Sequence, residues 1–172
     1  MPTIVCFSVQ QADREIGQLS GLLVDAVDSG ASVGFMPPLN HAEALDYWRG
    51  VIQSIGEGTR VLLVAMDGGA VEGAVQLALE TRANGDHRAE VMKLFVHRRA
   101  RRRGLAKALM AEVERTARQL GRTLLVMDTR KGGEAEKMCE ALGYVRFGDV
   151  PNYARNSDGR LHTTAFFYRQ LD

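Results

Sequence analysis

Residues 90–121, EVMKLFVHRRARRRGLAKALMAEVERTARQLG, are the stretch of sequence that decides the fold. The first seven residues, through Val96, are rich in large apolar side chains and are bounded by polar ones, which is typical of a strand. From Leu105 onward apolar residues recur every fourth position, as on the buried face of an amphipathic helix. Gly121 is a typical helix terminator. The stretch therefore predicts a strand, a basic turn and a long helix.

The turn between this strand and helix is rich in arginine and has Gly104 where the helix should begin. Its arginines are Arg98, Arg99, Arg101, Arg102 and Arg103. The first turn of a helix has amide N–H groups with no internal partner, and these groups bind anions. Glycine lets a ligand approach the backbone closely. We therefore expect a phosphate-bearing ligand, although neither the three-glycine dinucleotide pattern nor a Gly-Lys-Ser/Thr loop is present.

Composition narrows the class of protein. The chain has 172 residues, of which 45% are hydrophobic, and we expect a single domain over residues 1–172. Its net charge of +1 makes the basic turn a local feature and argues against a nucleic-acid partner. There is no apolar run of membrane length and no signal-peptide pattern, so we expect a cytoplasmic protein without a membrane partner. The two cysteines and four histidines show no ligand spacing, and no metal is expected.

Further elements are predicted on both sides of residues 90–121. We expect strands at 2–9, 60–66, 70–79, 123–127, 144–150 and 161–171, and helices at 13–27, 41–55 and 133–142. The strand at 123–127 should lie parallel to the strand at 90–96 through a right-handed connection. The carboxyl ends of these two strands, at Val96 and Asp128, should then face one cleft with Gly104. In the glycine- and proline-rich loop 30–40, Phe35 and Met36 either pack under the core or line a substrate pocket.

The order Arg101-x-x-Gly104-x-Ala106 after an apolar strand resembles the acetyl-coenzyme-A (acetyl-CoA) pyrophosphate loop of the GNAT superfamily of N-acetyltransferases. The predicted order of elements is similar to the whole GNAT fold. That fold is of the α/β (α+β) class, with a mixed, mostly antiparallel sheet of about seven strands and helices on both faces. The resemblance implies that acetyl-CoA is bound by main-chain groups of the central strand and by the loop. The implied positions are Leu94, Phe95, Val96, Arg101, Arg102, Arg103, Gly104, Leu105 and Ala106.

Within that superfamily the sequence is most similar to the tabtoxin-resistance type of acetyltransferase. The stretches that carry this resemblance are 30–36 (GASVGFM), 88–91 (RAEV), 125–129 (LVMDT) and 158–162 (DGRLH). They imply a primary amine of a small molecule as the acceptor, such as an amino-acid-like toxin or antibiotic. Phe35, Met36 and Tyr153 are the candidate substrate-binding residues, and family habit implies a homodimer.

Acetyl transfer to an amine by direct attack in a ternary complex needs a base, because alkylamines are mostly protonated at neutral pH. Glu90 and Asp128 are the candidates, and the tabtoxin-resistance type has acidic residues at both positions. The alternative is that Glu90 is an exposed strand residue and Asp128 a turn former. The thioester oxygen would be stabilised by backbone amides of the central strand.

One position departs from the family pattern. GNAT enzymes often have a tyrosine in the short helix before the final strands, and it is thought to protonate the coenzyme A sulfur. Here Cys139 occupies that position. The Cys139 thiol could donate the proton, Tyr153 could do so, or the thiolate could leave without an acid because a thiol pKa is only about 8.5. We favour the last reading, with Cys139 as a small apolar filler.

Three other functions stay open from the sequence. The chain could acetylate peptide or protein amines, for which an open groove would be needed. It could be a nucleic-acid or phosphate-binding module that uses the arginine run, although its near-neutral charge argues against this. It could also be a catalytically silent coenzyme A sensor, since the tyrosine is missing.

Overall fold

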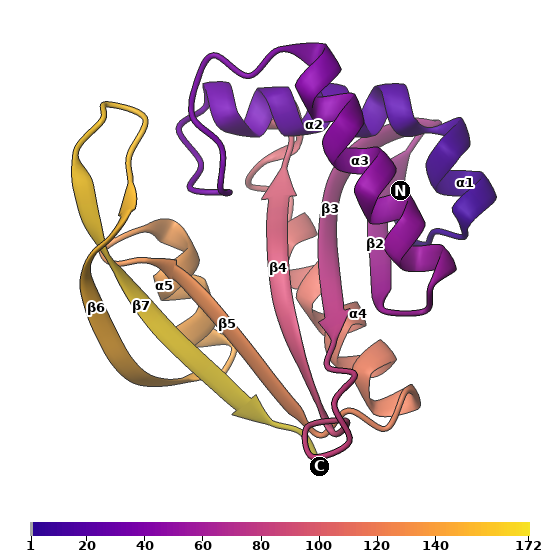
Figure 1. Cartoon of the computed structure of the whole chain (residues 1–172). Coiled ribbons are helices and arrows are strands. Elements are labelled where there is room, and N and C mark those ends of the chain that lie inside the picture. The colour runs from indigo at the N-terminus through magenta and orange to yellow at the C-terminus, as the bar shows by residue number, and fades with distance from the viewer. Residues whose placement is uncertain (1) are drawn as a thin grey trace.

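The computed structural model describes residues 2–172 and contains one seven-stranded sheet in the order β1-β2-β3-β4-β5-β7-β6 (Figure 1). The strands are β1 (Thr3–Cys6), β2 (Arg60–Asp67), β3 (Ala70–Leu79), β4 (Arg88–Val96), β5 (Leu124–Arg130), β6 (Val145–Arg155) and β7 (Leu161–Gln170). The helices are α1 (Val9–Arg14), α2 (Ile16–Asp28), α3 (His41–Gly56), the 3-10 turn η1 (Arg98–Ala100), α4 (Leu105–Gln119) and α5 (Glu134–Ala141). Only β4 and β5 pair in parallel, so the sheet is mixed and mostly antiparallel, as expected.

The sheet opens into two arms between β4 and β5. These strands pair at three positions only, Arg88 with Leu124, Ala89 with Leu125 and Glu90 with Val126. Beyond these pairs the strands diverge, and in Figure 1 they form the two sides of a V. One arm holds β1 to β4 and the other holds β5, β7 and β6. The divergence leaves the facing edges of β4 and β5 without a partner strand, which is where a ligand can enter.

Helices cover both faces of the first arm, as predicted. The face under α2 and α3 buries a cluster around Trp48, Leu62 and Val64. The opposite face buries a cluster in which the apolar stripe of α4, including Leu109 and Val113, packs on β2, β3 and β4. Burying such side chains stabilises a fold by roughly 1.5–3 kcal/mol each. The two cores hold β4 rigidly between them.

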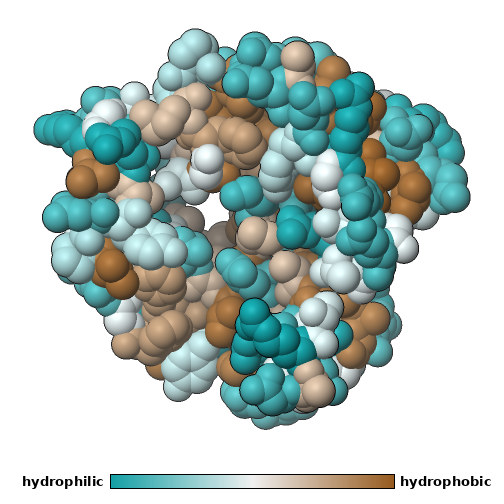
Figure 2. Space-filling model, in the orientation of Figure 1, coloured by the Kyte–Doolittle hydropathy of each residue, from teal (hydrophilic) through white to brown (hydrophobic). Residues whose placement is uncertain are grey.

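The second arm is covered by α5 on one face only. Its other face, on the side of α2 and α3, carries Phe147, Tyr153, Phe166 and Tyr168 in edge or tilted ring contacts. Phe147 is 62% exposed and Tyr153 is 54% exposed. Figure 2 shows a hollow between the two arms with brown, apolar surface beside it. Among the helices of residues 2–172, none is long and apolar enough to cross a membrane.

The N-terminus differs from its prediction. The first strand ends at Cys6 instead of Val9, and the single helix expected over 13–27 is two helices, α1 and α2, separated at Glu15. Ser8 caps α1 through a capping box in which its side chain accepts from the Gln11 amide and the Gln11 side chain accepts from the Ser8 amide. A serine followed by glutamine three residues later is the sequence signal that would have located this helix.

The strands next to the cleft are longer than predicted. β4 begins at Arg88, β5 runs on to Arg130, and β6 runs on to Arg155. Asp128 therefore lies within β5 and not after it, and Tyr153 belongs to a bulged strand and not to a loop. Asn152 has a φ of 56°, a left-handed conformation at a bulge in β6. The bulge interrupts the regular strand pattern, and the pairing of β6 with β7 continues beyond it.

A buried carboxylate connects α2 to the turn after β4. Asp25, 9% exposed, accepts a hydrogen bond from the Arg98 amide at 2.9 Å and forms an ion pair with the Arg98 guanidinium. Burial alone would raise the pKa of Asp25, but these hydrogen bonds and the nearby His97 outweigh it, and the pKa is lowered. This contact fixes where the chain leaves the central strand.

We predict that Asp25→Ala lowers the free energy of unfolding by about 1–3 kcal/mol, because it leaves the Arg98 amide without its acceptor. Asp28→Ala, which removes an exposed carboxylate on the same helix, should change it by less than about 0.5 kcal/mol. Because the pKa of Asp25 is lowered by folding, its contribution is complete above about pH 4 and is lost as the pH falls through the lowered value. Urea unfolding of both variants at several pH values measures this, and equal effects of the two substitutions would contradict it.

Candidate active site

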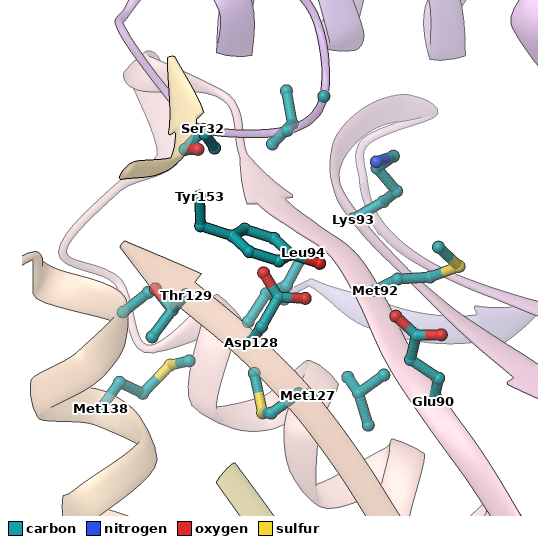
Figure 3. Close-up of a pocket in the computed structure, with 15 residues that line it drawn as sticks. Ser32, Glu90, Met92, Lys93, Leu94, Met127, Asp128, Thr129, Met138 and Tyr153 are labelled. Atoms are coloured by element: carbon teal, nitrogen blue, oxygen red, sulfur yellow. The ribbon is translucent and has the colours of Figure 1, made fainter. Parts of the chain in front are cut away.

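A cleft of about 290 Å³ lies between the diverging strands (Figure 3). Its walls come from β4 and β5, with further residues from loop 30–40, α5 and β6. The lining residues are Ser32, Val33, Gly34, Glu90, Val91, Met92, Lys93, Leu94, Met127, Asp128, Thr129, Ala135, Met138, Tyr153 and Ala154. A concave site with several polar groups on apolar walls is the usual form of a small-molecule site.

The structure brings both predicted carboxylates to this cleft. Glu90 is the parallel partner of Val126, and Asp128 lies two residues beyond Val126. Because side chains alternate along a strand, Glu90, Val126 and Asp128 project from the same face of the sheet. Figure 3 shows the two carboxylates turned toward the space between β4 and β5. The parallel pairing thus places both side chains in one cavity.

The environment of the cleft raises the pKa values of both carboxylates. Burial in the concave site raises the pKa of Glu90, and the Asp128 charge adds to this effect. Burial also raises the pKa of Asp128, opposed by Lys93. Neither carboxylate makes a hydrogen bond or ion pair with any of residues 2–172. Both remain accessible to solvent from the open side of the cleft, so both can exchange a proton with a ligand.

Loop 30–40 forms the roof of the cleft, but not through the residues that were predicted. Phe35 packs edge-to-face on Tyr47 with ring centroids 5.2 Å apart, and Met36 is exposed. Neither lines the cleft, so Phe35 follows the packing alternative, and substrate binding by Phe35 or Met36 stays a prediction. Their small neighbours line it instead, since Ser32 and Gly34 are the residues that fit close to the strands.

The roof also joins the two arms. The Ser32 hydroxyl lies 3.3 Å from Nε2 of His162 on β7, within hydrogen-bonding distance. Tyr153, the third predicted substrate-binding residue, does line the cleft, and in Figure 3 its ring extends from β6 toward Asp128. These contacts narrow the opening above the carboxylates.

Lys93 is a cleft residue that the sequence reasoning missed. It has a φ of 56° and sits in a β-bulge, where Lys93 and Leu94 together oppose Val75 of β3. The bulge turns its side chain into the cleft, where burial lowers its pKa. A lone lysine inside the apolar run 90–96 was the available signal. Simple alternation would have placed its side chain on the same face as Val91, which packs in the cluster under α4.

The turn after β4 has the form of an anion site. Gly104 has a φ of 78° and precedes α4, whose first internal bond is donated by the Ala108 amide to the Gly104 carbonyl. The amide N–H groups of residues 101–107 therefore have no partner within residues 2–172. A Cβ placed on Gly104 would meet nothing within 4 Å, so the space above these amides is open.

The arginine run divides into structural and free members. Arg98 pairs with Asp25, Arg99 with Glu72 at 3.0 Å, and Arg103 with Asp67 at 2.7 Å. The Arg101 guanidinium donates to the Val96 carbonyl at 3.1 Å, while Arg102 makes no hydrogen bond or ion pair with residues 2–172. Three of the five arginines thus neutralise carboxylates of the fold, and the binding of a phosphate by Arg101, Arg102 and Arg103 stays a prediction.

The three β4 residues predicted to bind acetyl-CoA through their main chain have different surroundings. Leu94 lines the cleft, whereas the Phe95 ring is buried against Trp48 with centroids 6.4 Å apart. The Val96 carbonyl accepts from Arg101. That their amides contact a thioester stays a prediction. No group of three or more His, Cys, Asp and Glu side chains in residues 2–172 is arranged to hold a metal ion.

Comparison with known proteins gives the family. The family model described as "Acetyltransferase (GNAT) family" matches residues 12–152, which is most of the chain. The chain belongs to the acetyltransferase (GNAT) family. Membership classes it as an acyltransferase. The narrower likeness to the tabtoxin-resistance type stays a prediction.

Individual relatives are distant. An uncharacterised N-acetyltransferase from the hisH–hisA intergenic region of Azospirillum brasilense is 35% identical over 109 residues, which are 62% of this chain and 63% of that protein. The match thus spans less than two thirds of the relative. The ribosomal-protein-alanine N-acetyltransferase of Brucella melitensis superposes with a TM-score of 0.82 at 19% identity, covering 98% of this chain and 99% of that one. The yncA protein of Salmonella typhimurium, solved with its cofactor acetyl-CoA, gives 0.79 at 19% identity over 100% and 95%. Such identities show a shared fold.

Within this GNAT fold, Cys139 does not take the place of a cleft-facing tyrosine. Its side chain is fully buried in the core, with Sγ 3.6 Å from Sδ of Met127, and burial raises its pKa to about 11. Ala135 and Met138 are the α5 residues that line the cleft. Of the three possibilities that the sequence left for proton donation, a donor role for Cys139 is therefore disfavoured, because its thiol is buried in the core and does not line the cleft.

We predict that the native protein has one rapidly reacting thiol, that of exposed Cys6, and one protected thiol, that of Cys139. Burial also raises the pKa of Cys6, but its thiol is exposed, so an aromatic disulfide reagent should label it much faster than Cys139, and Cys6→Ala should abolish the faster phase. Cys139→Ala should leave the rapid phase intact and remove a thiol that reacts only after unfolding, because burial disfavours the reactive thiolate. Two rapid thiols in the native protein would place Cys139 within reach of the cleft and contradict the structure.

Proposed function

We propose that the chain transfers an acetyl group from acetyl-CoA to a primary amine of a small molecule, by direct attack in a ternary complex. The observation that carries this proposal is the pair of carboxylates without hydrogen-bond or ion-pair partners, Glu90 and Asp128, on one face of the cleft, together with the free amides of the Gly104 turn that follows β4. The carboxylates suit an ammonium ion that must lose a proton, and the amides suit a phosphate.

The turn fits the pyrophosphate of acetyl-CoA. Unpartnered amides at the start of α4, the open space at Gly104 and the unpaired charge of Arg102 would bind it. When bound, acetyl-CoA supplies the activated acetyl group as a thioester. The β5-facing edge of β4 beyond Glu90, which lacks a partner strand, offers main-chain groups along the path into the cleft. The acetyl-CoA complex of the distantly related yncA protein supports the same assignment.

Glu90 and Asp128 would act on the acceptor amine. A carboxylate with a raised pKa is a stronger base than an ordinary one, and burial raises the pKa of both Glu90 and Asp128. Either residue can take the ammonium proton directly or through a water molecule. The amine, once neutral, attacks the thioester carbonyl, and the sulfur leaves without help from Cys139, whose thiol is buried.

The size of the cleft favours a small acceptor. A volume of about 290 Å³ lies at the lower end of ligand pockets, and the Ser32–His162 contact closes part of its entrance. This supports a small amine, such as the amino-acid-like toxin or antibiotic implied by the tabtoxin-resistance resemblance, over an extended peptide. A nucleic-acid module is less favoured, because three of the five arginines are paired within the fold. The homodimer also remains a prediction, which light scattering in solution would test.

We predict that Gly104→Ala raises the dissociation constant for coenzyme A about tenfold, because the added methyl enters the space left for the pyrophosphate. Gly121→Ala is the matched control. It has a φ of 69° and equally open surroundings, so it carries the same backbone strain of about 1–2 kcal/mol without facing the cleft. Calorimetric titration with coenzyme A measures both. Equal affinity in the two variants would argue against a phosphate site at this turn.

We predict that kcat/KM for amine acetylation falls as the pH drops through a group titrating above the ordinary carboxyl range of about 4. The sign follows from the raised pKa values, since the base works only when deprotonated. Glu90→Gln or Asp128→Asn, whichever removes the base, should lower kcat/KM about 10²- to 10⁴-fold and eliminate this limb.

The assay is release of free coenzyme A thiol over a panel of amino acids, aminoglycosides, polyamines and peptides. Asp46→Asn, which removes an exposed α3 carboxylate paired with Arg49, is the control and should leave the profile unchanged. Full activity in both cleft variants would disprove the carboxylate mechanism. Coenzyme A binding without turnover on any amine would instead favour the silent sensor.

A further inference from the structure

The cleft contains a cation whose partner is absent from the fold. Lys93 lies between the two carboxylates and the roof, and in Figure 3 its side chain rises from β4 away from Glu90 and Asp128. No hydrogen bond or ion pair, with nitrogen and oxygen within 4.0 Å, joins Lys93 to any of residues 2–172. Half-buried ammonium groups are normally paired, because losing water without gaining an anion is unfavourable.

The backbone of the roof lies close to this ammonium. A Cβ built on Gly34 would lie 3.1 Å from Nζ of Lys93, and Gly34 has a φ of 87° that other residues rarely adopt. Glycine therefore provides both the turn and the close approach. The opposite end of the side chain is fixed by the bulge at φ 56°. In this structure Nζ therefore lies against the roof at Gly34 and lines the cleft.

The charges of the cleft are thus divided in space. Glu90 and Asp128 supply negative charge on β4 and β5, and Lys93 supplies positive charge next to Gly34 and Ser32 under the roof. Arg60 is the other cation whose charge lowers the pKa of Glu90, and its guanidinium donates a hydrogen bond to the Gln76 side chain at 2.7 Å. A ligand that carries both an ammonium and a carboxylate complements this division, whereas a simple amine would leave Lys93 unpaired.

We propose that Lys93 binds the carboxylate of the acceptor, so that the acceptors of this enzyme are small amino acids. The amine is directed to Glu90 and Asp128, and the carboxylate lies against the Lys93 ammonium beneath Gly34. Lys93 is then a specificity-determining residue. This inference rests on the proposed acetyl transfer to a small amine.

A second role for the same ammonium is to lower the pKa values of Glu90 and Asp128, both of which its charge affects. The two roles differ in one respect. Tuning of the base would affect every amine acceptor alike, whereas carboxylate binding affects only acceptors that carry a carboxylate. The experiment therefore varies the acceptor and the enzyme together.

The test compares amino acids with their own carboxamides, using wild type and Lys93→Met in the pH-independent region of the profile. For amino acids we expect KM to rise about 10- to 100-fold in Lys93→Met, as for loss of a charge-assisted hydrogen bond, and kcat to change much less. For the carboxamides KM should change less than about twofold, because an amide has no charge for Lys93 to bind. Taking the ratio between enzymes for each acceptor cancels the different basicity of the two amines.

Two further variants separate specificity from folding. Lys137→Met, an exposed lysine of α5, is the matched control and should leave both acceptors unchanged. Lys93→Arg retains the charge and should recover part of the affinity for amino acids, limited by the space at Gly34. Coenzyme A affinity should be equal in all of these variants, which shows that the fold is intact.

The outcomes are distinguishable. An equal rise in KM, or an equal fall in kcat, for amino acids and carboxamides overturns the inference and assigns Lys93 to tuning the base. Wild-type acetylation of amines without any preference for carboxylate-bearing acceptors also overturns it, and leaves the proposed function standing. If the wild type acetylates no amine at all while binding coenzyme A, the proposed function fails, and this inference fails with it.

Discussion

The structure depends on the short parallel pairing of β4 with β5. Three residue pairs join two arms of the sheet, and the strands diverge where the pairing stops, after Glu90 and Val126. A longer ladder would close the sheet and leave no cleft. The helix that connects these strands, α4, buries its apolar stripe on the first arm, which holds β4 rigid at the point of divergence. The catalytic candidates lie on either side of that point.

The charged groups around this opening fall into two classes, those that form ion pairs within the fold and those that have no such partner. Asp25, Glu72 and Asp67 are paired with arginines of the turn after β4, and these pairs position the turn. The groups that face the cleft or the turn's open side are left without such partners, and they are Glu90, Asp128, Lys93 and Arg102. Lys93 is the half-buried member of this set, so its unpaired charge lowers the stability of the free protein, and a ligand of opposite charge offsets that cost. Inside the cleft, burial raises the pKa values of Glu90 and Asp128 and lowers that of Lys93.

Local sequence rules accounted for much of the fold. The β2–β3 hairpin around Gly68 and the α4 stripe follow from turn chemistry and periodicity, and their predicted bounds differ from the observed ones by at most a residue or two. The errors arose where a signal is not periodic. The Ser8–Gln11 capping box replaced the end of the first strand with a helix, and the positive φ of Asn152 concealed the continuation of β6 through Tyr153. Because strand pairing is a non-local interaction, it extended β5 past Asp128 without any local signal.

The sequence by itself indicated the family and most of the order of elements, and it predicted an anion site at Gly104 and two candidate bases, because each depends on residue types at short, regular spacings. Only the tertiary structure decided which groups face the cleft. It turned Cys139 and Phe35 toward packing partners and left Arg102 as the unpaired arginine of its run, since those outcomes depend on contacts between distant segments. It also brought Lys93 beside Gly34, because a bulge in β4 and a loop almost sixty residues earlier meet only after the sheet has formed.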